Sequence, residues 1–160
     1  MRNSLQKRTW AEVSLDNISH NYRAIRAALP EGCRFLGVVK ADAYGHGAVA
    51  VARLLESEGA DYLAVSCLDE AMELRSAGIT MPLLILGHTP SEYTETLIDN
   101  DITQTVSCLA KAQEFSARAA ALGRQLRIHI KIDTGMSRLG FLCSGDSFDE
   151  GVANVIASCR

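Results

Sequence analysis

The chain has 160 residues and a formal net charge of −3, with 48% hydrophobic and 22% charged residues. This composition fits one globular domain or part of a larger one, and it excludes a disordered or fibrous chain. The weakly acidic balance disfavours nucleic-acid binding, which usually needs a clustered basic surface. Because no run of 18 apolar residues occurs, the sequence predicts no membrane span.

The five cysteines are odd in number and widely spaced, and none forms a C-x-x-C pair. This pattern is typical of reduced thiols in a cytosol rather than of a disulfide framework. The first fifteen residues also lack the apolar stretch of a secretory signal. We therefore expect a cytoplasmic protein, and we expect no metal site because no second histidine or cysteine lies at metal spacing from His129.

The chain begins with a short stretch of alternating apolar and polar residues, 10–15, which predicts a strand. Asp16 is expected to cap a helix that ends near Pro30 and Gly32. From there strands and helices alternate. We expect strands at 34–40, 62–66, 83–87, 102–106 and 126–133, with helices at 47–58, after Ser66, after a capping box at 89–92, after Ser107, and near 146–158.

Alternating strands and helices predict a parallel sheet with right-handed crossovers. The spacing fits either a (β/α)8 barrel of TIM type or a doubly wound open sheet. A complete barrel typically needs about 250 residues. We therefore expect a partial barrel of about five strands, preceded by a strand and a helix. Such a half exposes two sheet edges, so we expect the chain to be an incomplete portion or to need a partner.

Lys40 stands at the end of an apolar strand, in the segment V-V-K-A-D-A-Y-G-H-G at 38–47. An ammonium group is costly in such a place unless it is used or paired. At the carboxyl end of a parallel strand it would project into the mouth where α/β proteins do chemistry, and a partly dry amine can attack a carbonyl. The alternative is a lysine that simply reaches solvent.

Gly45 and Gly47 flank His46 at the expected strand-to-helix junction. Flexible backbone with free amide groups beside a helix start suits a phosphate or a carboxylate, and Tyr44 could add a hydroxyl donor. The alternative is a tight turn with an incidental tyrosine.

The strand at 126–133 alternates strictly between apolar and ionisable residues. We expect its apolar face to pack on outer helices and its ionisable face, which includes His129 and Lys131, to point into the barrel; the alternative is an edge strand with a solvated face. Arg138 follows in a glycine-flanked loop, where a guanidinium could hold a carboxylate or a phenolate with two hydrogen bonds.

At these motifs the chain resembles the alanine racemase family, the fold-type-III pyridoxal phosphate enzymes. The resemblance covers essentially the whole chain. It is carried by R-T-W-A-E-V at 8–13, V-K-A-D-A-Y-G-H-G at 39–47, E-A-M-E-L-R at 70–75 and K-I-D-T-G-M-S-R-L-G at 131–140.

The resemblance implies a (β/α)8 barrel with the cofactor in its mouth, followed by a β-rich C-terminal domain. Residues 16–160 would form part of that barrel, the N-terminal catalytic domain of the family. Residues 1–15 would supply a strand that joins the C-terminal domain, which lies outside this sequence.

The resemblance also assigns roles to five residues. Lys40 matches the lysine that forms an aldimine with pyridoxal 5'-phosphate and acts as one of two proton-transfer groups. Tyr44 matches a tyrosine near the cofactor phosphate, and Leu86 a residue close to the cofactor. Lys131 matches a lysine that is carbamylated in some members. Arg138 matches the arginine that contacts the cofactor's phenolic oxygen and the substrate carboxylate.

The implied activity is interconversion of L- and D-alanine by a homodimer. In the family the second proton-transfer group is a tyrosine of the C-terminal domain, so we expect this chain to be inactive alone. The alternatives are a serine racemase of the same family and a non-catalytic, cofactor-binding or structural fragment. A decarboxylase or a small cofactor-carrier protein of the same fold type resembles only the first positions of the lysine motif.

Overall fold

The computed structural model describes residues 9–143 and 145–159. Its centre is a five-stranded sheet in which all strands are parallel and follow chain order. The strands are β1 (Leu36–Val38), β2 (Tyr62–Val65), β3 (Leu83–Ile85), β4 (Ile102–Val106) and β5 (Ile128–Ile130). A parallel sheet without strand-order reversal is the pattern of a barrel, so the expected partial α/β barrel is confirmed.

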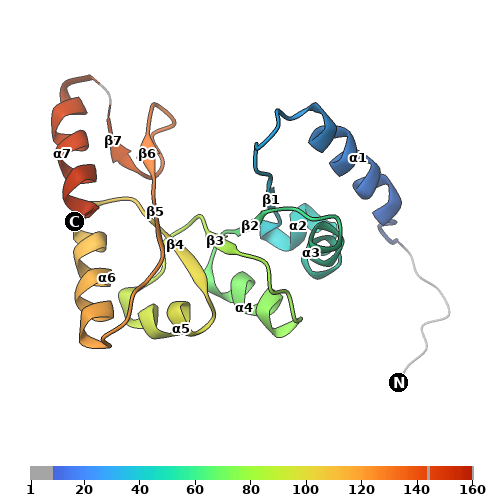
Figure 1. Cartoon of the computed structure of the whole chain (residues 1–160), viewed down its shortest axis with the longest axis horizontal. Helices are drawn as coiled ribbons and strands as arrows, with labels where there is room; N and C mark the ends of the chain where they lie inside the picture. The colour runs from blue at the N-terminus through green and yellow to red at the C-terminus, as the bar shows by residue number, and fades with distance from the viewer. Residues whose placement is uncertain (1–8, 144, 160) are drawn as a thin grey trace.

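Helices connect successive strands, and α3 to α6 follow one another around one side of the sheet (Figure 1). The helices are α1 (Leu15–Ala28), α2 (Lys40–Gly45), α3 (Ala48–Ser57), α4 (Leu68–Ser76), α5 (Thr94–Asp99), α6 (Leu109–Ala121) and α7 (Phe148–Ser158). Short 3₁₀ turns precede α5 and α7, at Ser91–Tyr93 and Gly145–Ser147. None of the helices within the described residues has the length and apolarity that a membrane crossing requires.

The main hydrophobic core lies between the sheet and these helices. Alternate residues of each strand point toward it, among them Leu63, Leu83 and Ile102, which are fully buried. The opposite face of β1 is open: Leu36 and Val38 are 38% and 40% exposed. A nearly continuous apolar run such as 34–40 indicates a strand buried on both faces, but β1 is buried on one face only, because nothing within the described residues covers its inner face.

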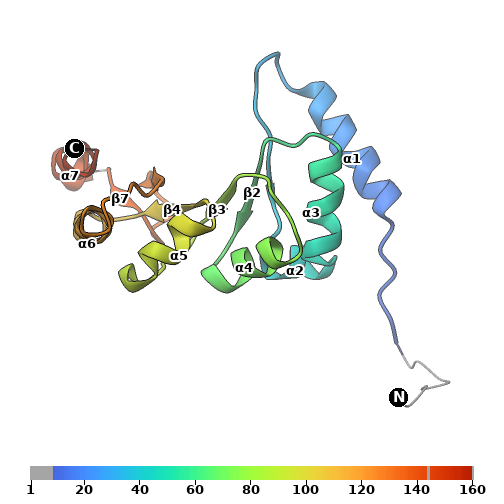
Figure 2. The same ribbon diagram turned by 60° about the horizontal axis from the view of Figure 1, so that its bottom comes forward.

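The N-terminal helix lies on the outside of the sheet, alongside α3 (Figures 1 and 2). Tyr22 packs its ring edge against Phe35, with ring centroids 4.9 Å apart. Glu58, which follows α3, accepts hydrogen bonds from Ser19 and Arg23 at 2.6 and 2.7 Å. One buried aromatic contact and one carboxylate thus hold α1 in place.

The predicted strand at 10–15 is not a strand here. Residues 9–14 are exposed coil and Leu15 already opens α1. A strand needs a neighbour for its backbone groups, and the described residues offer none. The helix cap also differs, because Ser14 rather than Asp16 accepts the hydrogen bond from the Asn17 amide, at 3.2 Å.

Two other predicted caps do not form. Thr89 is buried with an unpartnered Oγ1, Pro90 precedes a 3₁₀ turn, and α5 begins only at Thr94. The cap position of α6 is Cys108 instead of Ser107. In both places the helix begins later than predicted, and no side chain caps its first turn.

The predicted strand at 126–133 divides at Lys131. β5 ends at Ile130, and β6 (Ile132–Asp133) pairs with β7 (Phe141–Leu142) in a separate two-stranded parallel sheet. Lys131 belongs to both pairings, since its amide donates to the Val106 carbonyl and its carbonyl accepts from the Phe141 amide. The unbroken alternation of residues along this stretch does not reveal the change of partner.

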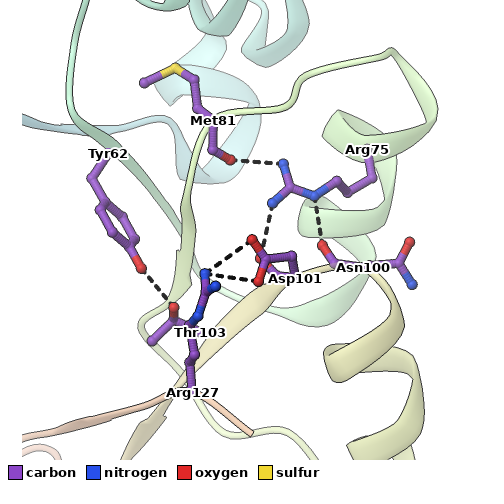
Figure 3. Close-up of polar contacts among 7 residues, drawn as sticks. All are labelled: Tyr62, Arg75, Met81, Asn100, Asp101, Thr103 and Arg127. Atoms are coloured by element: carbon purple, nitrogen blue, oxygen red, sulfur yellow. Dashed lines mark hydrogen bonds and ion pairs between the residues drawn. The ribbon is translucent and has the colours of Figure 1, made fainter. Parts of the chain in front are cut away.

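The amino ends of β3 and β4 are held by one guanidinium (Figure 3). Arg75 of α4 donates hydrogen bonds of 2.8–3.1 Å to four backbone carbonyls, those of Ile79, Met81, Asn100 and Asp101. Burial lowers the Arg75 pKa, and the carboxylates of Asp101 and Glu56 oppose that effect. Asp101 is also paired with Arg127 at 2.8 Å. These contacts stabilise the amino edge of the sheet, which lies at the opposite end of the strands from Lys40.

Candidate functional site

The expected site residues lie at the carboxyl edge of the sheet. Val38 pairs with Ala64 and Ala64 with Leu84 in the register. Two residues further along their strands come Lys40, Ser66 and Leu86, so these form one row across the sheet. Leu86 extends β3 by donating its amide to the Val65 carbonyl at 2.8 Å.

Lys40 is half-buried and follows β1 directly. Its side chain begins on the same face as Leu36 and Val38, since Gly37 and Val39 face the other way and a Cβ on Gly37 would meet Leu55 of α3. The Lys40 Nζ lies 5.9 Å from the centroid of the Tyr44 ring, within reach of a cation–π contact. The ammonium group therefore lies neither in the core nor fully in solvent.

The segment after Lys40 is a left-handed turn. Ala41, Asp42, Ala43 and Tyr44 have φ between 50° and 55° and ψ between 37° and 51°. The left-handed conformation costs an L-residue roughly 1–2 kcal/mol, and outside glycine it normally occurs singly. A run of four such residues next to Lys40 needs compensating contacts.

Asp42 supplies one of those contacts. Its Oδ1 accepts the Ala48 amide at 2.7 Å, and its carbonyl accepts the Gly47 amide at 2.9 Å. The His46 amide is bound to the Ala43 carbonyl. We expected free amides at Gly45–Gly47 for an anion, and that expectation is wrong for the amides of 46 and 47, which are bound inside the turn.

Glu70 supplies the other contact. Its Oε1 accepts the Ala41 amide at 2.9 Å, and its Oε2 accepts the Ser66 amide and hydroxyl at 2.6 and 2.8 Å. Burial raises the pKa of the Glu70 carboxyl, but the amides of Ser66 and Ala41 outweigh it and hold the pKa below its ordinary value. Sequence reasoning assigned Glu70 no function, and its only signal was its place in the E-A-M-E-L-R motif.

A cavity of about 280 Å³ opens on the inner face at the ends of β3 to β5. Leu84, Leu86, Thr105, His129 and Lys131 are among its lining residues, and Thr105 pairs with His129 in the register. His129 of β5 and Lys131, which follows it, thus line this inner-face cavity, as predicted, together with Ile130 and Ile132, while Leu126 and Ile130 also contact the hydrophobic core. Thr105 carries no motif and was not foreseen.

The loop that bears Arg138 is organised by Asp133. The buried Asp133 carboxylate accepts the amides of Gly135 and Ser137 at 2.9 and 3.1 Å, and these hydrogen bonds lower its pKa. Arg138 itself is exposed. Gly140 must be glycine, because its φ is 126° and a Cβ would lie 2.7 Å from the Asp133 nitrogen.

The structure thus brings Lys40 together with Tyr44, and Leu86 together with Lys131. Lys40, Tyr44 and Arg138 are not among the residues that line the cavity, although the strands that lead to them end at the same edge. This edge of the sheet therefore offers the Lys40 amine near the Tyr44 ring and, separately, a cavity lined by apolar side chains with a hydroxyl, an imidazole and a second amine.

The fold is that of a partial α/β barrel with an amine at the carboxyl end of its first strand. Comparison with known families gives the particular family. Residues 13–158 match the family described as "Alanine racemase, N-terminal domain". The chain belongs to the alanine racemase family.

Similar curated proteins include the alanine racemases of Desulfosudis oleivorans (47% identity over 131 residues) and of Clostridium perfringens strain SM101 (48% over 150 residues). These alignments cover 82% and 94% of this chain but 34% and 38% of those proteins. The chain therefore spans little more than a third of the length of such relatives.

Solved structures agree with this result. An alanine racemase from Clostridium difficile 630, in complex with cycloserine, superposes with a TM-score of 0.89 at 46% identity, over 98% of this chain and 42% of that one. A histidine racemase from Leuconostoc mesenteroides superposes with a TM-score of 0.77 at 28% identity, over 91% and 39%.

Proposed function

We propose that this chain carries the lysine half of the active site of a pyridoxal phosphate-dependent alanine racemase. The observation that carries the proposal is the half-buried Lys40 at the carboxyl end of β1, in a chain of the alanine racemase family. We further propose, from the resemblance, that residues 1–15 join a β-rich C-terminal domain, that residues 16–160 are part of the barrel, and that the complete protein is a homodimer.

The residues present fit the cofactor. Lys40 offers an amine for its aldehyde, Leu84 and Leu86 offer an apolar surface for its ring, and Arg138 offers a cation for its phenolic oxygen. Tyr44, near the Lys40 Nζ, would contribute its hydroxyl to the phosphate. Pyridoxal phosphate, when bound, supplies a ring that accepts the electrons left on an amino acid's Cα when a proton departs.

Racemisation requires that a proton leave one face of Cα and return to the other, so two groups must flank that carbon. We propose that Lys40 takes or gives the proton on one face and that Arg138 holds the substrate carboxylate. Lys131, which is half-buried and lines the cavity, is a candidate for carbamylation. The adduct would be negatively charged and would form an ion pair with Arg138. The second proton-transfer group would come from outside this chain.

The test is to add pyridoxal phosphate to the chain, reduce with borohydride, and map the modified lysines by mass spectrometry. The sequence has only four lysines, at 7, 40, 111 and 131. We expect Lys40 to carry the label and Lys111, a partly buried lysine of α6 that is paired with Glu114, to serve as internal reference. Equal labelling of Lys40 and Lys111 in a folded chain contradicts the proposal.

We expect the same preparation to racemise L-alanine slowly or not at all, because one of the two proton-transfer groups is missing. A chain in which Lys40 is labelled and turnover is nevertheless fast would contradict the two-group scheme but not the role of Lys40.

We also propose a cytoplasmic location for the protein, which the free cysteines support.

A second candidate is a racemase with another amino acid as substrate. It is favoured by the likeness to the Leuconostoc mesenteroides histidine racemase. A panel of L-amino acids, including serine and histidine, offered to the complete protein separates the two candidates.

A further inference from the structure

The E-A-M-E-L-R motif of α4 is left without a function by the scheme above. Its arginine, Arg75, binds the four carbonyls at the amino edge of the sheet. Its first residue, Glu70, points the other way, toward the carboxyl edge, where it contacts the residue that follows Lys40.

The Glu70 carboxylate joins two neighbouring strand ends. One oxygen binds the Ala41 amide, just after β1, and the other binds the amide and hydroxyl of Ser66, just after β2. Ser66 lies beside Lys40 in the row across the sheet. The carboxylate therefore ties the backbone just after Lys40 to the end of the neighbouring strand β2.

We infer that Glu70 is a positioning residue that fixes the direction in which Lys40 presents its amine. The direction of the Lys40 side chain is set by the backbone at 39–41, and the Ala41 amide is where the left-handed turn begins. Without the carboxylate, the turn keeps its Asp42 contacts to 47 and 48 but loses its tie to β2. This role rests on the proposed function of Lys40.

The matched variants lie on the same helix. Glu70→Gln keeps the size of the side chain but replaces one acceptor oxygen by a donor, so Ala41 and Ser66 cannot both be satisfied. Glu73→Gln makes the same charge change at an exposed position of α4. Arg75→Met removes the contacts at the amino edge and is a control for loss of stability alone.

The experiment measures two quantities in each variant of the chain. The first is borohydride-fixed pyridoxal phosphate on Lys40 relative to Lys111. We expect Glu70→Gln to lower this ratio about tenfold, because misplacing a reacting group by about 1 Å has effects of this order or larger. We expect Glu73→Gln to leave it unchanged, and Arg75→Met to leave it unchanged while lowering the melting temperature.

The second quantity, hydrogen exchange of the Ala41 and Ser66 amides, does not depend on the cofactor. We expect faster exchange at both in Glu70→Gln and no change within α6. An unchanged labelling ratio in Glu70→Gln overturns the inference, and so does unchanged exchange at Ala41. If wild-type Lys40 is not labelled at all, the proposed function fails, and faster exchange in Glu70→Gln would still support Glu70 as the brace of the Lys40 turn.

Discussion

Gly87 lies where the carboxyl ends of β2 and β3 come closest. Its amide donates to the Ser66 carbonyl at 3.1 Å, and its carbonyl accepts from the Gln104 side chain at 2.8 Å. A Cβ on Gly87 would collide with the Ser66 carbonyl oxygen. Because that atom belongs to the backbone, the clash cannot be relieved by a side-chain rotation.

Replacing Gly87 by alanine is therefore expected to be more damaging than replacing Gly37. At Gly37 a Cβ would meet the tip of Leu55, 2.6 Å away, which can turn aside. We expect Gly87→Ala to lower the free energy of unfolding by about 3 kcal/mol and Gly37→Ala by about 1 kcal/mol. Urea unfolding followed by circular dichroism measures the free energy of unfolding of both variants. Equal destabilisation by the two substitutions would contradict the expected difference between a backbone clash and a side-chain clash.

At the scale of elements, carboxylates join helices to the strand ends. Glu56 of α3 accepts the amide and hydroxyl of Thr80 and the amide of Met81 at 2.9–3.0 Å, just before β3. The hydrogen bond from the Thr80 amide lowers the Glu56 pKa, and burial opposes it less strongly. Glu56 thus holds α3 to β3 in its ionised form.

A lowered pKa in the folded state has a defined consequence for stability. Glu56 contributes stability above its ordinary pKa of 4.5, and this contribution is lost as the pH falls through the lower folded-state value. We expect Glu56→Gln to melt at a lower temperature than wild type at neutral pH, with the difference shrinking in acid. Glu95→Gln, at an exposed position of α5, is the control. A difference that grows in acid would contradict the assignment.

Comparison of predicted and observed strands and helices shows which parts of the fold could be predicted from the sequence. Alternation of strand and helix signals predicted all five strands in their order, because buried parallel strands bounded by turn residues are distinctive. The division of 126–133 at Lys131 could not be foreseen, since β6 keeps the same alternation while pairing with a different strand. The predicted caps also failed: Ser14 takes the place of Asp16, whereas α5 and α6 begin without any side-chain cap, although Thr89 and Ser107 are nearby residues able to cap.

For the site, the sequence predicted Lys40 at a strand end and the inward-facing side of β5. It could not predict Glu70 or Asp42 as contacts of the Lys40 turn, because these bonds depend on a left-handed backbone that four ordinary L-residues do not favour. The roles of Tyr44, Leu86, Lys131 and Arg138 toward a cofactor stay predictions.

At the scale of the whole molecule, β1 and β5 each pair on one side only within the described residues. Leu36 of β1 and Ile128 of β5 are exposed apolar residues on these edges. Unpaired, apolar edge strands favour edge-to-edge association. The chain offers two such edges, one at each end of the sheet.

We therefore expect the 160-residue chain to self-associate, and Leu36→Lys combined with Ile128→Lys to shift it toward the monomer. Ile25→Lys, which places the same charge on an exposed apolar position of α1, should leave association unchanged. Sedimentation velocity over a concentration series distinguishes these outcomes. A wild-type chain that stays monomeric throughout would contradict the expectation.

The turn that follows Lys40 also has a stereochemical consequence. The φ of 50° and ψ of 51° at Ala41 are the mirror image of an ordinary right-handed helix, which is the natural conformation of a D-amino acid. Ala41 is exposed. A chain assembled by chemical ligation with D-alanine at position 41 should relax strain there, so an enantiomer that damages most helices is expected to be tolerated at this one.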